Sequence, residues 1–201
     1  MGIPVLILGE SGSGKSASLR NFTPEEISIF NVAGKPLPFR KKLPKVKTSD
    51  YRMIMAGLQK SQKKSFAIDD SQYLLSFELF DRVDERSYDK YSDMARKFSG
   101  LIRFVADQMP DDRIVYFLHH PQVTEDGRIK AKTVGKMLDN QLTVEGLFSI
   151  VLLCRTDGQR HYFETQSDGY TTAKSPMEMF EFEIDNDLKL VDQKIREYYE
   201  I

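Results

Sequence analysis

Residues 9–16 read Gly-Glu-Ser-Gly-Ser-Gly-Lys-Ser, a glycine-rich loop that constrains the fold more than any other segment of this 201-residue chain. The loop follows a short, continuously apolar run at residues 4–8, which is typical of a strand buried on both faces. Glycines let the backbone curl so that successive N–H groups point inward, where they can bind phosphate oxygens. The strand before this loop and the helical stretch after it are the context that such a loop requires, and the alternation of strands and helices along the chain predicts an α/β fold with a mainly parallel sheet.

The loop matches the pattern GxxxxGK[ST], in which each residue type has a chemical role. Lys15 is expected to reach the terminal phosphates of a nucleotide, and the Ser16 hydroxyl is expected to bind Mg²⁺. A flexible Gly/Ser turn is the alternative, but it explains neither the preceding strand nor the lysine and serine. The predicted phosphate-binding residues are Gly9, Glu10, Ser11, Gly12, Ser13, Gly14, Lys15, Ser16 and Ala17.

A second apolar run, at residues 65–68, ends in two acids, Asp69 and Asp70. A nucleotide site of this kind needs a carboxylate at the end of a neighbouring strand to hold the metal. We therefore predict that Asp69 and Ser16 are the metal-binding residues. Asp70 either orients the attacking water as a catalytic residue or caps the helix that follows, and the sequence leaves these two roles open.

Two histidines, His119 and His120, end the apolar run at residues 113–118, at the sheet edge where ligands bind. Adjacent side chains of a strand point to opposite faces, so we expect one histidine to sense the γ-phosphate and the other to make a structural hydrogen bond. No third ligand accompanies them, so they predict no metal site. His161 begins a later strand and is expected to be structural.

Composition restricts the class of protein. The chain has 29 Lys and Arg against 30 Asp and Glu, so bulk charge attracts neither nucleic acid nor membrane. Cys154 is the only cysteine, and no apolar run approaches the roughly 18 residues that span a bilayer, so we expect a single cytoplasmic domain over residues 1–201. The predicted strands are 4–8, 27–32, 65–68, 113–118, 148–153 and 161–165, and the predicted helices are 49–60, 91–108 and about 185–200, the last capped by Asp185 or Asn186.

Local charge is less even than the total. Residues 34–64 contain ten Lys or Arg and one acid, with Phe39 among the cations, and a second basic stretch follows the Asp126-Gly127 turn. For each stretch alone, contact with single-stranded DNA and plain solvation are equally good explanations, but the two stretches together favour a polyanion. Lys174 and Arg155 are candidates for a cation that completes a neighbouring subunit's site. The candidate DNA-binding residues are Arg40, Lys41, Lys42, Arg128, Lys130, Lys132 and Lys136.

The ordered set of motifs resembles a family of phage-encoded ATPases with a minimal RecA-like core, commonly labelled AAA-family ATP-binding proteins, some of which are single-strand annealing recombination proteins. The resemblance covers nearly the whole chain. It rests on GESGSGKS at 9–16, KPLPFR at 35–40, FAIDDSQYL at 66–74, IVYFLHH at 114–120, GRIKAKTVGKML at 127–138 and TAKSP at 172–176.

This resemblance implies a RecA-like P-loop NTPase fold, ATP with Mg²⁺, self-assembly, and single-stranded DNA as partner in the cytoplasm of a bacterial host. It implies that the loop after His120 corresponds to the DNA-binding loop of RecA-like proteins. Because no separate DNA-binding domain is visible, DNA binding is expected to depend on an oligomer or on a single-strand-binding protein.

The sequence therefore predicts an ATP-hydrolysing protein that acts on single-stranded DNA in recombination or replication. One alternative is a nucleotide-gated binding module with negligible hydrolysis, because many related ATPases have the longer Glu where this chain has Asp70. A small-molecule or nucleotide kinase is a further alternative, although Arg128 is the only Arg at residues 121–136, where a kinase lid would usually carry several.

Overall fold

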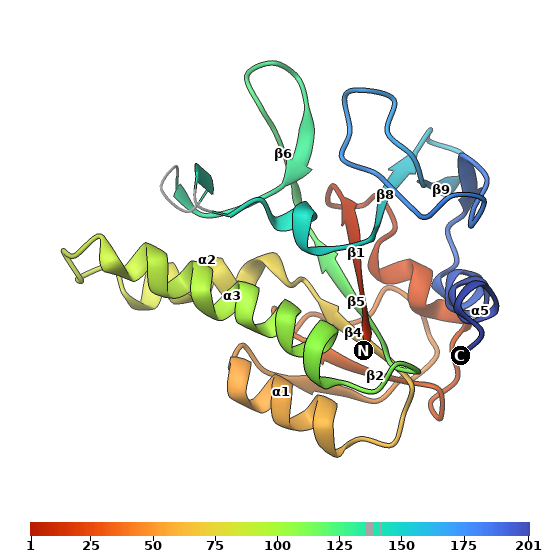
Figure 1. The fold of residues 1–201 in the computed structure, drawn as a ribbon, viewed down its shortest axis with the longest axis horizontal. Helices are drawn as coiled ribbons and strands as arrows, with labels where there is room; N and C mark the ends of the chain where they lie inside the picture. The colour runs from red at the N-terminus through yellow and green to blue at the C-terminus, as the bar shows by residue number, and fades with distance from the viewer. Residues whose placement is uncertain (136–138, 141) are drawn as a thin grey trace.

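The computed structural model describes residues 1–135, 139–140 and 142–201, and the predicted DNA-binding residue Lys136 lies outside this part. The described chain forms an eight-stranded, mainly parallel sheet flanked by helices (Figure 1), which confirms the predicted α/β class. The strand order is β10-β9-β8-β1-β5-β4-β2-β3, in which β8–β9 and β9–β10 are the antiparallel pairs. The strands are β1 (Ile3–Gly9), β2 (Ile27–Asn31), β3 (Lys45–Lys47), β4 (Ser65–Asp69), β5 (Ile114–His119), β8 (Ile150–Thr156), β9 (His161–Glu164) and β10 (Glu183–Asp185).

Helices cover both faces of the sheet (Figure 1). On one face lie α1 (Tyr51–Lys60), α2 (Gln72–Asp81) and α3 (Asp89–Gln108), and on the other lie the short 3₁₀ helix η1 (Ser16–Asn21) and α5 (Leu188–Tyr199). A hairpin of β6 (Pro121–Val123) and β7 (Ile129–Ala131) leaves the carboxyl end of β5, and a second 3₁₀ helix, η2 (Val144–Leu147), precedes β8. All six predicted strands are present.

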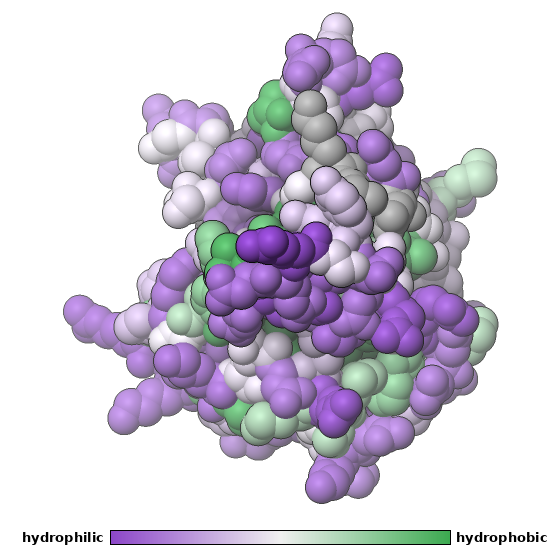
Figure 2. All heavy atoms as spheres, turned by 90° about the vertical axis from the view of Figure 1, so that its left-hand side faces the viewer, coloured by the Kyte–Doolittle hydropathy of each residue, from purple (hydrophilic) through white to green (hydrophobic). Residues whose placement is uncertain are grey.

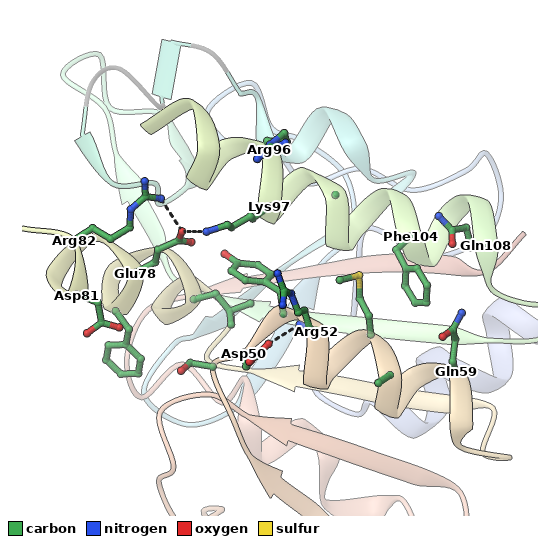
Figure 3. Close-up of a pocket in the computed structure, with 17 residues that line it drawn as sticks. Asp50, Arg52, Gln59, Glu78, Asp81, Arg82, Arg96, Lys97, Phe104 and Gln108 are labelled. Atoms are coloured by element: carbon green, nitrogen blue, oxygen red, sulfur yellow. Dashed lines mark hydrogen bonds and ion pairs between the residues drawn. The ribbon is translucent and has the colours of Figure 1, made fainter. Parts of the chain in front are cut away.

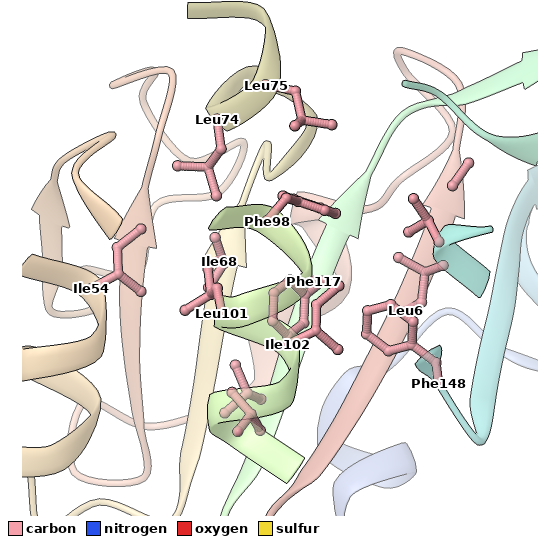
Figure 4. Packing of buried hydrophobic residues seen from close by; sticks show 14 of the residues in the cluster. Leu6, Ile54, Ile68, Leu74, Leu75, Phe98, Leu101, Ile102, Phe117 and Phe148 are labelled. Carbon is pink, nitrogen blue, oxygen red and sulfur yellow. The ribbon is translucent and has the colours of Figure 1, made fainter. Parts of the chain in front are cut away.

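The alternation of side chains along the central strands builds two apolar layers. In β1, Leu6 and Leu8 pack under α1, α2 and α3, whereas Val5 and Ile7 pack against η1 and α5. Figure 4 shows the first layer, in which Phe117 of β5 lies beside its strand neighbour Leu6 and Phe98 of α3 belongs to the same cluster. Every residue of β4 and β5 is buried, which agrees with strands covered on both faces.

Two details of the helices differ from the sequence prediction. The stretch after the glycine-rich loop forms only η1, which is six residues long. The cap of α5 is Asp187, whose side chain accepts a hydrogen bond from the Lys189 N–H, so the prediction of Asp185 or Asn186 is wrong. Asp185 is still part of β10, and the Asn186 amide donates instead to Cys154 Sγ at 3.1 Å.

Where α2 ends and α3 begins, the surface is mainly hydrophilic (Figure 2). Three of its acids share one base: the Arg82 guanidinium contacts Glu78, Glu85 and Asp93 at 2.7 to 3.1 Å. Among the described helices, none has the length and apolar character required to cross a membrane.

Candidate phosphate and metal site

Three central strands bring the predicted site residues to one edge of the sheet. β5 lies between β1 and β4, and all three run parallel, so Gly9, Asp69 and His119 are the last residues of neighbouring strands. The glycine-rich loop and the Asp69-Asp70 pair therefore meet at the carboxyl edge, where parallel α/β sheets bind ligands.

The backbone of the loop requires glycine. Gly12 and Gly14 have φ angles of 84° and 105°, a region that residues with a Cβ rarely adopt. At Gly14 a Cβ would also lie 3.1 Å from the His161 ring and 3.3 Å from the Asn186 amide. A Cβ at Gly9 would collide with Ser13 Oγ, a buried hydroxyl that has no hydrogen-bond partner.

Lys15 curls back into this loop. Its ammonium donates hydrogen bonds to the carbonyl oxygens of Gly9 at 2.6 Å and Glu10 at 3.0 Å, and the residue is buried. Burial lowers the pKa of Lys15, whereas Cys154 and the carboxylates of Asp70 and Asp69 act in the opposite direction. A buried cation inside a ring of backbone groups fits a phosphate, whose oxygens can replace these carbonyls as acceptors.

Ser16 and Asp69 are 53 residues apart in sequence, yet the Ser16 hydroxyl donates to Asp69 Oδ1 at 2.7 Å. Burial raises the pKa of Asp69, and the Ser16 hydrogen bond acts in the opposite direction. In the described part of the chain, no three His, Cys, Asp or Glu residues form a metal-binding group. The pair therefore fits a cation such as Mg²⁺ that takes its other ligands from phosphate and water.

Asp70 has an unusual backbone conformation, and its side chain lies close to a lysine and a histidine. Its φ of 61° is left-handed, and its carboxylate lies 3.0 Å from Lys35 Nζ and 3.3 Å from His120 Nε2. The His120 contact lacks hydrogen-bond geometry, so Nε2 stays a buried nitrogen without a hydrogen-bond partner. Burial raises the pKa of Asp70, but His120 and Lys35 together hold it below its usual range.

The side chain of Asp70 therefore contacts Lys35 and His120 and makes no capping contact with α2. The residue that caps α2 is Ser71, and no side chain makes a capping hydrogen bond there. This geometry opposes the capping role and leaves the water-orienting role as a prediction. A left-handed conformation at a non-glycine residue costs free energy, and such strain is concentrated at functional sites.

The two histidines have different surroundings. His119 is fully buried: its Nε2 donates to the Lys132 carbonyl at 2.8 Å, and its Nδ1 lies 2.9 Å from Ser71 Oγ. Both of its nitrogens are thus used within the protein, and His120 is the histidine that faces Asp70. His161, on β9, contacts the glycine-rich loop through Nδ1 and the Ser13 carbonyl at 2.7 Å.

Sequence reasoning missed three residues around the site. Lys35 lies in the segment after β2 and contacts Asp70. The Cys154 thiol donates to the Ser13 carbonyl of the loop, and the Asn186 amide donates to Cys154 Sγ. The KPLPFR motif contains Lys35, but its spacing gives no sign that this lysine turns back to the acids.

The candidate DNA-binding residues fall into two groups. Arg40 and Lys42 are exposed, while Lys41 Nζ donates to the Phe22 carbonyl at 3.2 Å. Phe39 packs partly against the apolar layer of η1 and α5, which opposes its predicted role in stacking on bases. On the β6–β7 hairpin, Arg128 pairs with Asp126 and Lys130 pairs with Asp139, whereas Lys132 is exposed.

Arg155 and Lys174, the two candidates for a cation that completes a neighbouring subunit's site, do not contact Asp69 or Asp70 in the part of the chain that the structure describes. Arg155 Nε contacts Glu164 at 3.1 Å on the β8–β9 hairpin. The backbone of Lys174 pairs with Val151 of β8. Within the described residues, no ion pair joins either cation to Asp69 or Asp70.

A groove of about 1040 Å³ opens between α1, α2 and α3, away from the loop (Figure 3). None of the predicted phosphate or metal residues lines it. Its charged side chains pair with each other, as Glu78 does with Lys97 at 2.6 Å and Arg82 at 3.1 Å. The groove is large enough to be considered as a ligand site, but the convergence of Lys15, Ser16 and Asp69 is the stronger chemical indication of a functional site.

Comparison of the chain with models of known protein families finds no match, and neither does comparison with curated proteins.

Proposed function

We propose that this protein is a RecA-like P-loop ATPase that binds ATP with Mg²⁺ and acts on single-stranded DNA. The observation that carries the proposal is the 2.7 Å contact between Ser16 and Asp69, beside the buried ammonium of Lys15. It joins a phosphate-type loop to a carboxylate on a strand that is not adjacent to β1.

In this proposal each group has one task. Lys15 and the loop N–H groups hold phosphate oxygens, Ser16 and Asp69 hold Mg²⁺, and Asp70 orients the attacking water. Bound Mg²⁺ supplies positive charge at the phosphate oxygens. His120 lies beside the Asp70 carboxylate, and His119 links β5 to the β6–β7 hairpin through the Lys132 carbonyl.

DNA is the less supported half of the proposal. Its support is the exposed cations Arg40, Lys42 and Lys132, together with the connection of the hairpin to the carboxyl edge of β5. Such cations bind phosphate backbones without reading base sequence. The proposal of a role in annealing or replication therefore requires that DNA stimulates ATP hydrolysis.

The test is steady-state ATP hydrolysis with and without single-stranded DNA. We expect DNA to stimulate hydrolysis and Lys15→Ala to lower the rate by about 10²-fold or more. Lys64→Ala is the matched control, because Lys64 is an exposed lysine paired with Asp112 far from the loop. An equal rate of hydrolysis with and without DNA would refute the DNA role. A rate that Lys15→Ala leaves unchanged would refute the assignment of the glycine-rich loop as the ATP site.

A nucleotide-gated binding module without hydrolysis is the second candidate. It is favoured by the contacts of Asp70 with Lys35 and His120, which occupy the carboxylate that would otherwise hold water. Slow turnover that Asp70→Ala leaves unchanged, combined with tight ATP binding, would favour this candidate. A kinase is less well supported, since no loop residue lines the groove that could take an acceptor.

A further inference from the structure

Lys35 places a second ammonium group near Asp69 and Asp70, the two carboxylates whose charges also act on Lys15. Its Nζ lies 3.0 Å from Asp70 Oδ2, and its charge also acts on Asp69. Lys35 and Lys15 thus approach the Asp69-Asp70 pair from different segments, one from the chain after β2 and the other from the glycine-rich loop.

The backbone of Lys35 is anchored, whereas its ammonium can move. The Lys35 carbonyl accepts a hydrogen bond at 2.7 Å from Asn31, a buried residue at the end of β2. Gly34, with φ of 72°, makes the turn before it. Lys35 Nζ lies over the Tyr73 ring, 5.0 Å from the ring centroid, and the side chain is 59% exposed. Rotation about the side-chain bonds can therefore redirect the ammonium without unfolding the segment.

A γ-phosphate held by Lys15 would bring negative charge close to the Asp70 carboxylate. Two anions this close repel each other strongly unless a cation lies between them. Lys35 is the lysine that already contacts Asp70, and a phosphate carries more charge than a carboxylate, so it competes well for the ammonium.

Building on the proposed function, we propose that Lys35 is a γ-phosphate-binding residue that pairs with Asp70 in the absence of ATP and with the γ-phosphate in its presence. The exchange releases the Asp70 carboxylate to orient water only when ATP occupies the loop. ADP lacks the γ-phosphate and leaves the Lys35–Asp70 pair intact, so the residue distinguishes the two nucleotides.

The test measures equilibrium binding of ADP and of a non-hydrolysable ATP analogue, each with Mg²⁺, by titration calorimetry. For Lys35→Ala we expect the preference for the analogue over ADP to fall roughly tenfold, the equivalent of one charge-assisted hydrogen bond. Lys35→Arg should keep most of the preference because it keeps the charge. Lys64→Ala, which removes an equally exposed lysine from a 3.1 Å pair with Asp112, should keep all of it.

The outcomes separate this inference from the proposed function. If wild type binds both nucleotides and Lys35→Ala leaves their ratio unchanged, or weakens both equally, the inference is wrong and the ATP site stands. If wild type binds neither nucleotide, the proposed function fails and the inference fails with it. Should Lys35→Ala not fold, Lys35→Met gives the same comparison, because it keeps the chain over Tyr73 without the charge.

Discussion

His119 makes the stability of the fold depend on pH. It ends β5, is fully buried, and joins Ser71 at the start of α2 to the carbonyl of Lys132 after the hairpin. Burial lowers the pKa of His119 from 6.5 to about 4, and the charges of His120 and Lys15 add to this effect. The imidazole is therefore neutral in the folded chain under conditions that protonate it in the unfolded chain.

The sign and size of the effect follow from these two pKa values. Between pH 6.5 and about 4 the unfolded chain binds more protons at this residue, so the free energy of unfolding falls as the pH falls. The stability that neutral His119 provides is complete above pH 6.5. From about pH 7 to about pH 5 the loss is about 2 kcal/mol, or roughly 4–8 °C in melting temperature for a chain of this size.

The assay is thermal unfolding of wild type and His119→Gln over this pH range, followed by circular dichroism. Glutamine retains a donor and an acceptor but does not titrate, so its melting temperature should fall less on acidification. Acids such as Asp93, whose pKa is also lowered, are present in both proteins and cancel in the difference. Equal pH slopes for the two proteins, or an NMR titration of His119 near its ordinary value of 6.5, would refute the reasoning.

Three further substitutions test the fold by urea denaturation. Gly14→Ala forces a side chain into a φ of 105° and should cost about 1 kcal/mol or more in the free energy of unfolding. Phe98→Ala empties a fully buried site and should cost about 3–5 kcal/mol, and a loss below about 1 kcal/mol would contradict the packing. Asp192→Ala removes a buried carboxylate that accepts hydrogen bonds from Tyr116 and Arg196, and should cost about 3 kcal/mol; exposed Asp107→Ala is its control.

The main elements of the fold could be predicted from sequence because their signals are long. The central strands are continuous apolar runs, and α1 and α3 have clear apolar stripes. The strand β3 (Lys45–Lys47) could not be found, since it has only three residues and all of them are exposed. A helix after Asp70 is expected from sequence, but the bounds of α2 could not be predicted, because apolar residues occur all around it and leave no clear stripe.

Some residues of the candidate site could likewise be predicted from sequence and others could not. Gly9 to Ser16 is a local motif, and Asp69 follows from the apolar strand before it, so both could be assigned from sequence. The contact of Lys35 with Asp70 depends on the path of a loop between segments 35 residues apart. A lysine in a polar, proline-containing segment looks solvated from sequence alone, and only the fold shows its partner.

The proposed site also predicts stability that depends on both nucleotide and metal. A ligand that binds only the folded chain, present at about a hundredfold above its Kd, stabilises it by about 2.7 kcal/mol, which is roughly 5–11 °C in melting temperature here. We expect ATP with Mg²⁺ to give such a shift, and EDTA to reduce it, because phosphate charge then lies beside Asp69 without a cation between them.

Asp69→Asn tests whether the metal that contributes to this stabilisation binds at Asp69. The asparagine Oδ1 can still accept the hydrogen bond that Ser16 donates at 2.7 Å, so the loop keeps its support. The variant loses the charge that attracts the metal and also the charge that repels phosphate. It should therefore lose the metal-dependent part of the ATP shift while its shift in EDTA equals or exceeds that of wild type. A variant that kept the full metal dependence would show that the metal binds elsewhere, and with it the reading of the Ser16–Asp69 contact would fail.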